Sequence, residues 1–437
     1  MKTSYPLTTR RLDDVIACVD GVDVRVGEFL GQVQALAATL PNHRYVINLA
    51  GNRYQFLLGF CAAIAAGQCT LLPPNRQKAT IAGIAAEYGD SYVFEEATVP
   101  PAAPVREVPE VPADRLVAMI FTSGSTGDST AHPKYWRMLR DGAVANTECY
   151  GIGRERIYML ATVPPQHNWG LETSVLLPLI ADIAVSSETP FFPQDIADAL
   201  ARLPEPRVIV SSPIHLESLL NSGIDAITID LILSATAPLS QRLAGELETH
   251  FSARVNEVFG CTEAGSLASR ATASESLWQV AAPFRFDVLD NRVRISADHL
   301  PEPVVLNDII ELVGDASFRW LGRDQDMINI AGKRGSLAHL NHRLAQIPGV
   351  VDGVIFLPGE DSKRLAALVV APGLEPSAIL DALKETIDPA FLPRPLYLVP
   401  TLPRQETGKL ARKMVLDLFE ATRNLSEDDG APADKPA

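Results

Sequence analysis

The chain contains, directly after an apolar segment, the stretch Phe121-Thr122-Ser123-Gly124-Ser125-Thr126-Gly127. Glycines let a backbone fold closely around an anion, consecutive N–H groups form a concave nest, and small hydroxyl side chains add donors without bulk. The stretch therefore suits a polyphosphate. It is not a Walker A loop, because no Gly-Lys-Ser or Gly-Lys-Thr follows at the required spacing. A plain flexible linker has the same letters, so this stretch alone leaves both interpretations open.

Short β-rich runs alternate with amphipathic stretches on both sides of this loop, through about residue 320. We expect strands at 44–49, 116–122, 157–162, 207–211 and 226–234. We expect helices at 52–66, 195–203 and 239–251. This alternation favours an α/β fold, with stacked βα units around mostly parallel sheets.

A different pattern begins after residue 321, where Gly322-Arg323 opens a polar hinge. Helix 337–346, strand 350–356, strand 364–371 and helix 376–387 are expected in short order. The sequence therefore predicts a large N-terminal domain over 1–321 and a small, mobile C-terminal α+β domain over 322–424. Residues 425–437 have no apolar periodicity, and we predict that they form a disordered tail.

Composition narrows the class of protein. The chain has 437 residues, of which 47% are hydrophobic and 21% charged, and this balance excludes disorder, collagen and small disulfide scaffolds. The formal net charge of -15 disfavours a nucleic-acid partner. The small domain is near neutral, so most of the negative charge lies in the large one.

The cysteines and the apolar segments bear on localisation. The five cysteines are scattered and never spaced as Cys-x-x-Cys, which is typical of buried thiols in a reducing compartment. No secretory apolar region precedes Arg10-Arg11, so we expect a cytoplasmic protein. The most lipid-like run, 56–72, is interrupted by two glycines and a glutamine. We interpret it as a buried helix followed by a strand rather than a membrane span.

Three further stretches carry polar residues in patterns suited to chemistry. In Phe259-Gly260-Cys261-Thr262-Glu263, an aromatic ring can cover a purine, a hydroxyl can reach a phosphate, and a carboxylate can hold a divalent cation. The other two are Leu321 to Arg334 and Pro403 to Arg412, the second of which contains Thr407-Gly408-Lys409. Each could be ordinary loop chemistry, but all four stretches occur in this order at plausible separations.

Together the four stretches resemble the motifs of the adenylate-forming superfamily of acyl-CoA synthetases, peptide-synthetase adenylation domains and luciferases. Thr122 to Gly127 is similar to its phosphate loop, and Phe259 to Glu263 to its aromatic-Gly-x-Thr-Glu motif. Ser234-Ala235-Thr236-Ala237-Pro238-Leu239 resembles its adenine-side loop. Gly322-Arg323 resembles its domain junction, and Thr407 to Lys409 its catalytic lysine motif. The resemblance covers most of the chain.

Within the superfamily, three segments look most like the short ligases that accompany aryl-polyene and xanthomonadin-type pigment pathways. These segments are Val163 to His167, Gly170 to Ser174 and Ala331 to Arg334. That likeness implies an aromatic hydroxy acid as substrate. The residues alone do not rank a hydroxybenzoate, a cinnamate or a medium-chain fatty acid.

The resemblance implies ATP and Mg²⁺ as partners in the first half-reaction, in which a carboxylate attacks the α-phosphorus and pyrophosphate departs. Lys409 is implied as the ammonium that bridges the two anions. Glu263 and Thr126 would form the Mg²⁺ site, and Thr262 and Thr126 would donate to phosphate oxygens. Phe259 would pack on adenine. Asp308 takes the place of the ribose-binding aspartate, with Arg323 as its companion.

A second half-reaction transfers the acyl group to the thiol of CoA or of a carrier protein's phosphopantetheine, after the small domain rotates about Gly322-Arg323. The resemblance places Gly332 in the thiol channel and Arg334 near a phosphate of AMP or of the pantetheine arm. The acid itself would occupy a pocket lined by His167, Trp169, Ser212 and Ala237.

Two departures limit the resemblance. Five residues, Asp128 to His132, stand where the family has one, so we do not predict Lys134 as a phosphate ligand. Gln325 takes the pivot position that is usually Asp or Lys. Two other classes stay open: a nucleotide-binding pseudo-ligase scaffold without catalysis, and an unrelated hydrolase or P-loop ATPase. The second is disfavoured because the chain has neither a Walker A loop nor a Gly-x-Ser-x-Gly elbow.

Overall fold

A computed structural model describes residues 3–96, 103–123, 129–153, 155–225, 227–289, 292–323, 327–330, 333–359, 362, 364–404 and 410–428. The chain divides into two compact units. The first comprises 1–288 and 294–305, and the second comprises 289–293 and 306–437. The predicted boundary between a domain over 1–321 and a domain over 322–424 stays a prediction.

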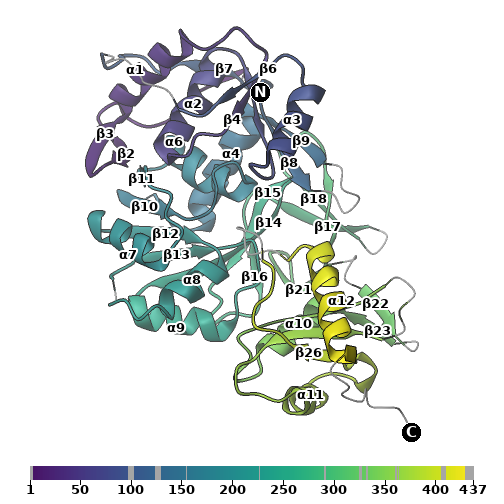
Figure 1. Cartoon of the computed structure of the whole chain (residues 1–437). Coiled ribbons are helices and arrows are strands. Elements are labelled where there is room, and N and C mark those ends of the chain that lie inside the picture. Colours follow the sequence, from purple (N-terminus) through teal and green to yellow (C-terminus); the bar gives the residue numbers. More distant parts are fainter. Residues whose placement is uncertain are drawn as a thin grey trace. The chain divides into compact units, whose positions relative to one another are not determined.

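A five-stranded sheet in the first unit is mostly parallel and has the order β6-β4-β5-β8-β9 (Figure 1). Only its last pair, β8 with β9, is antiparallel. Its strands are β4 (Tyr45–Asn48), β5 (Cys69–Leu72), β6 (Ser91–Phe94), β8 (Leu116–Ser123) and β9 (Ser129–Tyr135). Helix α3 (Lys78–Glu87) packs on one face of this sheet through a small apolar cluster.

A larger sheet in the same unit has a parallel centre. Its strands run in the order β16-β15-β14-β13-β12-β10-β11-β2-β3, and every pair from β14 to β2 is parallel. The bounds are β2 (Val15–Val19), β3 (Val22–Arg25), β10 (Ile157–Ala161), β11 (Ile183–Ser186), β12 (Arg207–Ser211), β13 (Leu231–Ser234), β14 (Arg254–Cys261), β15 (Gly265–Arg270) and β16 (Trp278–Val280).

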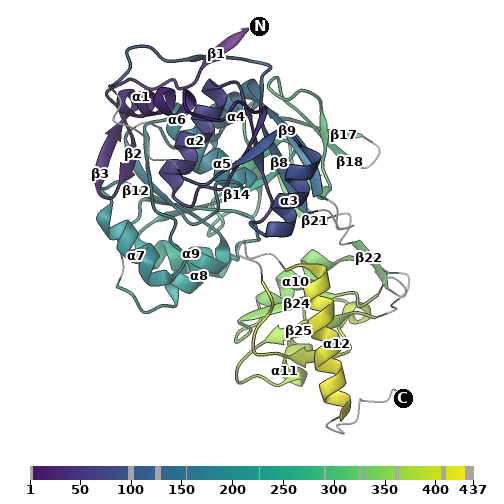
Figure 2. The ribbon, with the colours of Figure 1, turned by 45° about the horizontal axis from the view of Figure 1, so that its top comes forward.

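Helices fill the space between these two sheets and cover the outer face of the larger one. The central group is α1 (Val26–Ala37), α2 (Arg53–Ala65), α4 (Trp136–Cys149), α5 (Asn168–Leu171), the π-helix η1 (Glu172–Leu176) and α6 (Leu177–Ile180). Helices α7 (Pro193–Arg202), α8 (Pro213–Leu220) and α9 (Gln241–Phe251) form a second core on the outer face (Figures 1 and 2). The α/β class predicted from the alternating pattern is confirmed.

Helix α2 shows why the apolar run at 56–72 is not a surface element. Nearly all its residues are buried, because it is apolar on every side and must be surrounded by other elements. The fully buried strand β5 follows it, as predicted. None of the helices in the described part of the chain combines the length and apolarity that crossing a bilayer requires.

Two short sheets complete this part of the chain. Strand β1 (Ser4–Pro6) pairs antiparallel with β7 (Glu110–Pro112). The other sheet has the order β17-β18-β19, with bounds Arg285–Leu289, Arg292–Ser296 and Val304–Val305.

The second unit is an α+β arrangement with its own apolar core. Its strands are β20 (Asp308–Leu312), β21 (Ser317–Arg323), β22 (Met327–Ile330), β23 (Lys333–Ser336), β24 (Asp352–Phe356), β25 (Ala366–Val370) and β26 (Leu396–Leu398). Its helices are α10 (Leu337–Ala345), α11 (Pro376–Lys384), the 3-10 turn η3 (Pro389–Phe391) and α12 (Arg412–Asp428). Helices α10 and α11 share one apolar cluster with β24 to β26, and α12 packs on a second.

Two predicted boundaries were wrong. The strand expected over 226–234 is shorter, since pairing with both neighbours begins at Leu231. The tail predicted to be disordered from 425 is helical through Asp428, because α12 continues past its last buried residue, Phe419. An established helix extends readily, since each added residue gains a hydrogen bond without a new nucleation cost.

Replacing Arg53 should test how α2 is anchored. Its buried guanidinium donates to the carbonyls of Ala161 and Val163 and to the hydroxyl of Ser174. Arg53→Met keeps much of the volume but leaves these acceptors without a donor, so we expect a loss of about 2 to 4 kcal/mol in the free energy of unfolding. Urea denaturation would measure it, with exposed Arg44→Met as the control. Equal stabilities of the two variants would contradict this account.

Candidate active site

The first half of the predicted phosphate loop lies at the end of the β8–β9 hairpin. Thr122 is half-buried on β8, and its hydroxyl lies 3.0 Å from Nε2 of His132 on β9. Ser123 ends β8. Gly124, Ser125, Thr126 and Gly127 lie outside the described residues, so their predicted contacts with phosphate stay predictions.

Most of the predicted insertion belongs to strand β9. Ser129 pairs with Ser123 and His132 with Ile120, so residues 129–132 extend β9 alongside β8, while Asp128 lies outside the described residues. Lys134 consequently pairs with Ala118 and lies deep in the sheet. A strand can absorb extra residues in this way without displacing the chain that follows, provided that its partner is long enough.

The predicted Thr-Glu motif forms the turn Cys261–Gly265 between β14 and β15. A register shift between Phe259 and Gly260 precedes it. A Cβ atom on Gly260 would come within 2.4 Å of the Gly265 carbonyl oxygen, so the two strands approach closely only because this residue is glycine. The turn leaves Thr262 half-buried and Glu263 exposed.

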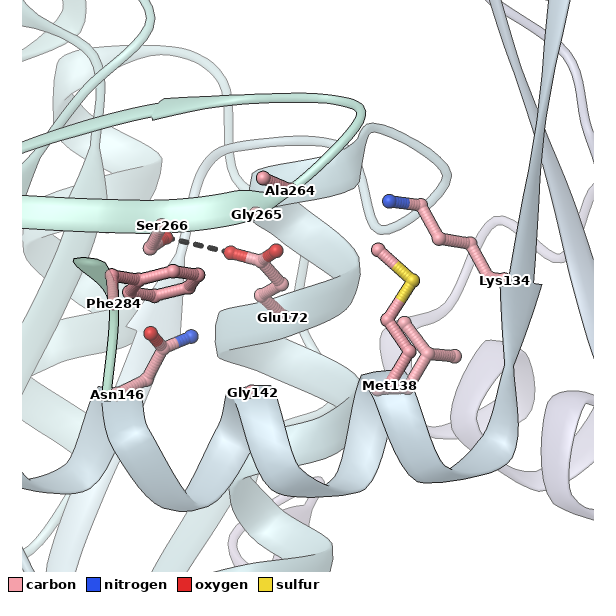
Figure 3. A pocket seen from close by; sticks show the side chains of 10 residues that line it. Lys134, Met138, Gly142, Asn146, Glu172, Ala264, Gly265, Ser266 and Phe284 are labelled. Carbon is pink, nitrogen blue, oxygen red and sulfur yellow. Dashed lines mark hydrogen bonds between the residues drawn. The ribbon is translucent and has the colours of Figure 1, made fainter. Parts of the chain in front are cut away.

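The hairpin and the turn meet through Lys134. Its side chain is 1% exposed, and its ammonium donates to the carbonyl oxygen of Thr262. Burial lowers the pKa of the Lys134 ammonium, while the carboxylates of Glu172 and Glu263 are among the groups that oppose that shift. Figure 3 shows the side chain reaching from its strand toward the turn.

His132 belongs to the same group of charges. Burial lowers the pKa of the His132 imidazole, and the nearby Glu263 carboxylate opposes this. The structure therefore brings together Thr122, His132, Lys134, Thr262 and Glu263, of which sequence reasoning missed His132 and Lys134. The signal that could have found Lys134 is the Pro-Lys pair at the end of the loop, which the family places closer to its glycines.

The adenine-side loop leaves the end of β13, next to β14. Ser234 and Ala235 are buried, and Thr236 has the left-handed φ of +77°, a conformation that a β-branched residue rarely adopts. Ala237 is half-buried. The backbone N–H of Leu239, just beyond them, donates to the Glu257 carboxylate at 2.7 Å.

Glu257 is itself held in the core. Its carboxylate accepts hydrogen bonds from Arg270 at 2.7 Å and from the Thr272 hydroxyl at 2.9 Å. Burial raises the pKa of Glu257, and Arg270 opposes that shift. The Arg270 guanidinium also lies over the ring of Trp278. The ring centroids of Trp278 and of the half-buried Phe259 are 5.5 Å apart. Phe259 is thus placed in an aromatic and cationic cluster.

The predicted acid pocket draws on two other strand ends. Ser212 is buried at the start of α8, and its hydroxyl contacts Nδ1 of His215 at 2.9 Å. His167 precedes α5 and is half-buried, and Trp169 is buried within that helix. That these residues and Ala237 share one pocket stays a prediction.

In the second unit, Asp308 and Arg323 lie at paired backbone positions. They are Cα partners in the antiparallel pair β20–β21, and the Asp308 carboxylate accepts from the indole N–H of Trp320 at 2.9 Å. Arg334 lies on β23, opposite Asn329. Lys409 lies outside the described residues, as do Gln325 and Gly332. Arg404 and Leu410, on either side of 405–409, form an antiparallel bridge.

The carboxylate of Glu263 fits a magnesium ion that is bound chiefly by a nucleotide. Mg²⁺ prefers oxygen ligands and is commonly held by one or two carboxylates plus substrate phosphates. Among the residues that the structure describes, no group of three or more His, Cys, Asp or Glu side chains could hold a metal alone. Glu263 is exposed at the tip of its turn, near His132, whose ring contacts the Thr122 hydroxyl. Its carboxylate is therefore placed where it can share a magnesium ion with a bound nucleotide.

These features are those of an α/β enzyme that binds a nucleotide at the carboxyl ends of parallel strands. The family model of AMP-binding enzymes matches residues 10–296. The chain belongs to this family, which confirms the predicted superfamily and its enzyme class, an ATP-dependent acid–thiol ligase that forms an acyl adenylate.

Two kinds of known protein are similar to the chain. A 4-coumarate--CoA ligase from Halorhodospira halophila is 28% identical over 301 residues, which are 66% of this chain and 73% of that protein. Several further relatives are long synthetases, of which the chain matches no more than 26% of the length. The structure of the anthranilate CoA ligase AuaEII with anthranoyl-AMP has a TM-score of 0.81 at 14% identity, covering 98% of this chain and 99% of that one.

A further solved structure shares the fold. The o-succinylbenzoate coenzyme A synthetase MenE from Bacillus subtilis, with ATP and a magnesium ion, has a TM-score of 0.78 at 16% identity. The aligned region covers 94% of this chain and 99% of the MenE chain. At these identities the structural likeness shows the fold alone.

Gly260→Ala should displace the Thr262–Glu263 turn, because the new Cβ overlaps a backbone oxygen that cannot move aside like a flexible side chain. We expect ATP affinity, measured by isothermal titration calorimetry, to fall roughly 10-fold or more, since small misplacements of binding groups are costly. The matched control is Gly83→Ala on α3, where a Cβ meets nothing within 4 Å. Wild-type ATP affinity in Gly260→Ala would show that the close approach is unimportant.

Proposed function

We propose that the protein activates an aromatic, hydroxybenzoate- or cinnamate-like acid as an acyl adenylate and transfers it to the thiol of CoA or of a carrier protein's phosphopantetheine. The observation that carries the proposal is the meeting of the β8–β9 hairpin with the Thr262–Glu263 turn through buried Lys134. It joins the two predicted phosphate-binding segments in a chain of the AMP-binding enzyme family.

The adenylation step needs positive charge and hydrogen-bond donors, because an anionic carboxylate must approach an anionic phosphate. The carboxylate oxygen forms a bond to the α-phosphorus. The bond between that phosphorus and the oxygen that bridges to the β-phosphate breaks, and pyrophosphate leaves with the electron pair of that bond. In the proposal, Thr262 donates its hydroxyl to a phosphate oxygen, and Glu263 holds the magnesium ion that accompanies ATP. Lys409 bridges the acid and the α-phosphate by analogy with the family's lysine motif.

The nucleoside end of ATP would lie along the ends of β13 and β14. Phe259 offers an aromatic face, and the loop from Ser234 to Ala237 offers backbone groups next to it. Asp308 and Arg323, paired across β20–β21, would meet the ribose. Arg334 keeps its proposed role at a phosphate.

The preference for an aromatic acid has separate support. The related ligase from H. halophila is named for 4-coumarate, a cinnamate, and the sequence segments around His167 resemble those of pigment-pathway ligases. We propose His167, Trp169, Ser212 and Ala237 as the lining of the acid pocket. A medium-chain fatty acid is the competing substrate, and a non-catalytic scaffold is the competing function.

The thiol acceptor would approach the second unit. Lys333 and Arg404 are already paired, with Asp388 and Asp352 respectively. Arg412 and Lys413 are exposed at the start of α12, where their charges can meet a partner. A carrier protein is usually acidic, and we propose that it docks there.

Pyrophosphate exchange across a panel of aromatic and aliphatic acids tests the proposed function. We expect ATP-dependent exchange with at least one aryl acid and a weaker response to medium-chain acids. Lys409→Ala should lower the exchange rate by several orders of magnitude, because it removes the charge between two anions. ATP binding without exchange on any acid would instead indicate a scaffold, and unimpaired exchange in Lys409→Ala would end the lysine assignment.

Charge reversal at Arg412 and Lys413 tests the acceptor. If the acceptor is an acidic carrier, the double variant Arg412→Glu, Lys413→Glu should load it roughly 10-fold more slowly at low salt, with adenylation unchanged, because rim charges act mainly on association rates. Loading would be followed by mass spectrometry of the carrier. Unchanged loading, together with equal use of free CoA, would refute the docking proposal.

A further inference from the structure

Glu172 is a buried carboxylate that the proposed chemistry does not use. It begins the π-helix η1, which follows α5 directly, and it is 7% exposed. π-helical turns are rare and are often found at functional sites. A glutamate is seldom buried unless its charge is paired or hydrogen-bonded. Its surroundings therefore need an explanation.

Two side chains donate to this carboxylate from different elements. The Ser266 hydroxyl on β15 donates to Oε2 at 2.6 Å, and the Asn168 amide on α5 donates to Oε1 at 2.9 Å. The Tyr150 hydroxyl in turn donates to Ser266 Oγ at 2.9 Å. Glu172 thus ties α5, next to His167, to the strand that follows the Thr262–Glu263 turn.

The backbone of the turn also rests against Glu172. Gly265 has the left-handed φ of +91°, and a Cβ atom there would lie 2.5 Å from Glu172 Oε1. Any other residue at 265 would push the turn and the carboxylate apart. Figure 3 shows the Glu172 side chain pointing at this end of the turn while Lys134 reaches toward it from another strand.

The two buried charges face a common space of restricted size. Lys134 and Glu172 both line a pocket with about 10 Å³ of free volume, together with Gly265 and Ser266. That is room for about one water molecule, so a substrate group does not fit there. The burial of Glu172 raises the pKa of its carboxyl, and Ser266 and Lys134 oppose the shift.

We infer that Glu172 is a positioning residue: with Lys134 it holds the two ends of the Cys261–Gly265 turn and so sets where the Thr262 hydroxyl and the Glu263 carboxylate stand. Lys134 fixes the turn through the carbonyl of Thr262, and Glu172 fixes it through Gly265 and Ser266. This inference rests on the proposed function, because it assumes that Thr262 and Glu263 bind magnesium-ATP.

Glu172→Gln tests the inference, since it keeps the shape of the side chain but removes its charge and half of its accepting capacity. The control is Thr173→Val, which removes the buried 2.7 Å hydrogen bond to the Trp169 carbonyl one residue further along the same π-turn. Calorimetry would measure ATP affinity of each full-length variant with and without Mg²⁺. Thermal unfolding would be recorded in parallel.

We expect Glu172→Gln to reduce the gain in ATP affinity that Mg²⁺ brings by roughly 10-fold, because a small displacement of Glu263 weakens shared ligation. Thr173→Val should leave that gain at the wild-type value. Combining Glu172→Gln with Glu263→Gln should reduce the Mg²⁺-dependent gain in ATP affinity no further than Glu263→Gln alone, since Glu172 acts on that gain through the Glu263 carboxylate.

A purely structural role predicts a different result. In that case Glu172→Gln would lower the melting temperature, and the ratio of ATP affinities with and without Mg²⁺ would match that of the wild type. That outcome overturns the inference, while the proposed function stands if wild-type protein still shows acid-dependent pyrophosphate exchange. Absence of ATP binding and exchange in the wild type would instead refute the proposed function itself.

Discussion

The candidate site depends on one buried ammonium. Lys134 belongs to the five-stranded sheet, and the carbonyl of Thr262 that it contacts belongs to a turn of the larger sheet. An unpaired charge in a protein interior is very costly, so the hydrogen bond to Thr262 and the carboxylates of Glu172 and Glu263 stabilise the charged form of this ammonium. The two sheets are therefore held at this point, and the segments that resemble phosphate binders are brought together by the same contact.

Two buried carboxylates, those of Glu257 and Glu172, anchor the segments that follow the loops of the site. Glu257 accepts from the N–H of Leu239 and so anchors the chain just beyond the adenine-side loop. Glu172 accepts from Ser266, just beyond the Thr262–Glu263 turn. Both carboxylates lie within the core and are satisfied by hydrogen bonds. The loops therefore keep defined positions while the exposed Glu263 stays available to a ligand.

Much of the fold could be predicted, because apolar strands and one-sided helices carry their pattern in neighbouring residues. The buried helix α2 and the strands β8, β10 and β12 follow from such patterns. The start of β13 did not, since the pairing with β12 and β14 begins only at Leu231, although the residues just before it also favour a strand. The predicted start of the tail at 425 was also placed too early, because α12 continues through Asp428 although its last residues are mostly polar. Both errors concern the boundary of an element, which depends on what it packs against.

The sequence by itself determined the fold class, the order of the motifs, and the identity of Thr262 and Glu263 as candidates, because each rests on residues that are close in the chain. Only the tertiary structure decided that Lys134 contacts the Thr262–Glu263 turn in spite of the five inserted residues, and that Glu172 lies beneath the same turn. Strand pairing absorbs the insertion, and electrostatic attraction and hydrogen bonding act between groups that are near in space. The contacting residues are about one hundred positions apart along the chain, so patterns among neighbouring residues do not reveal that they lie close together.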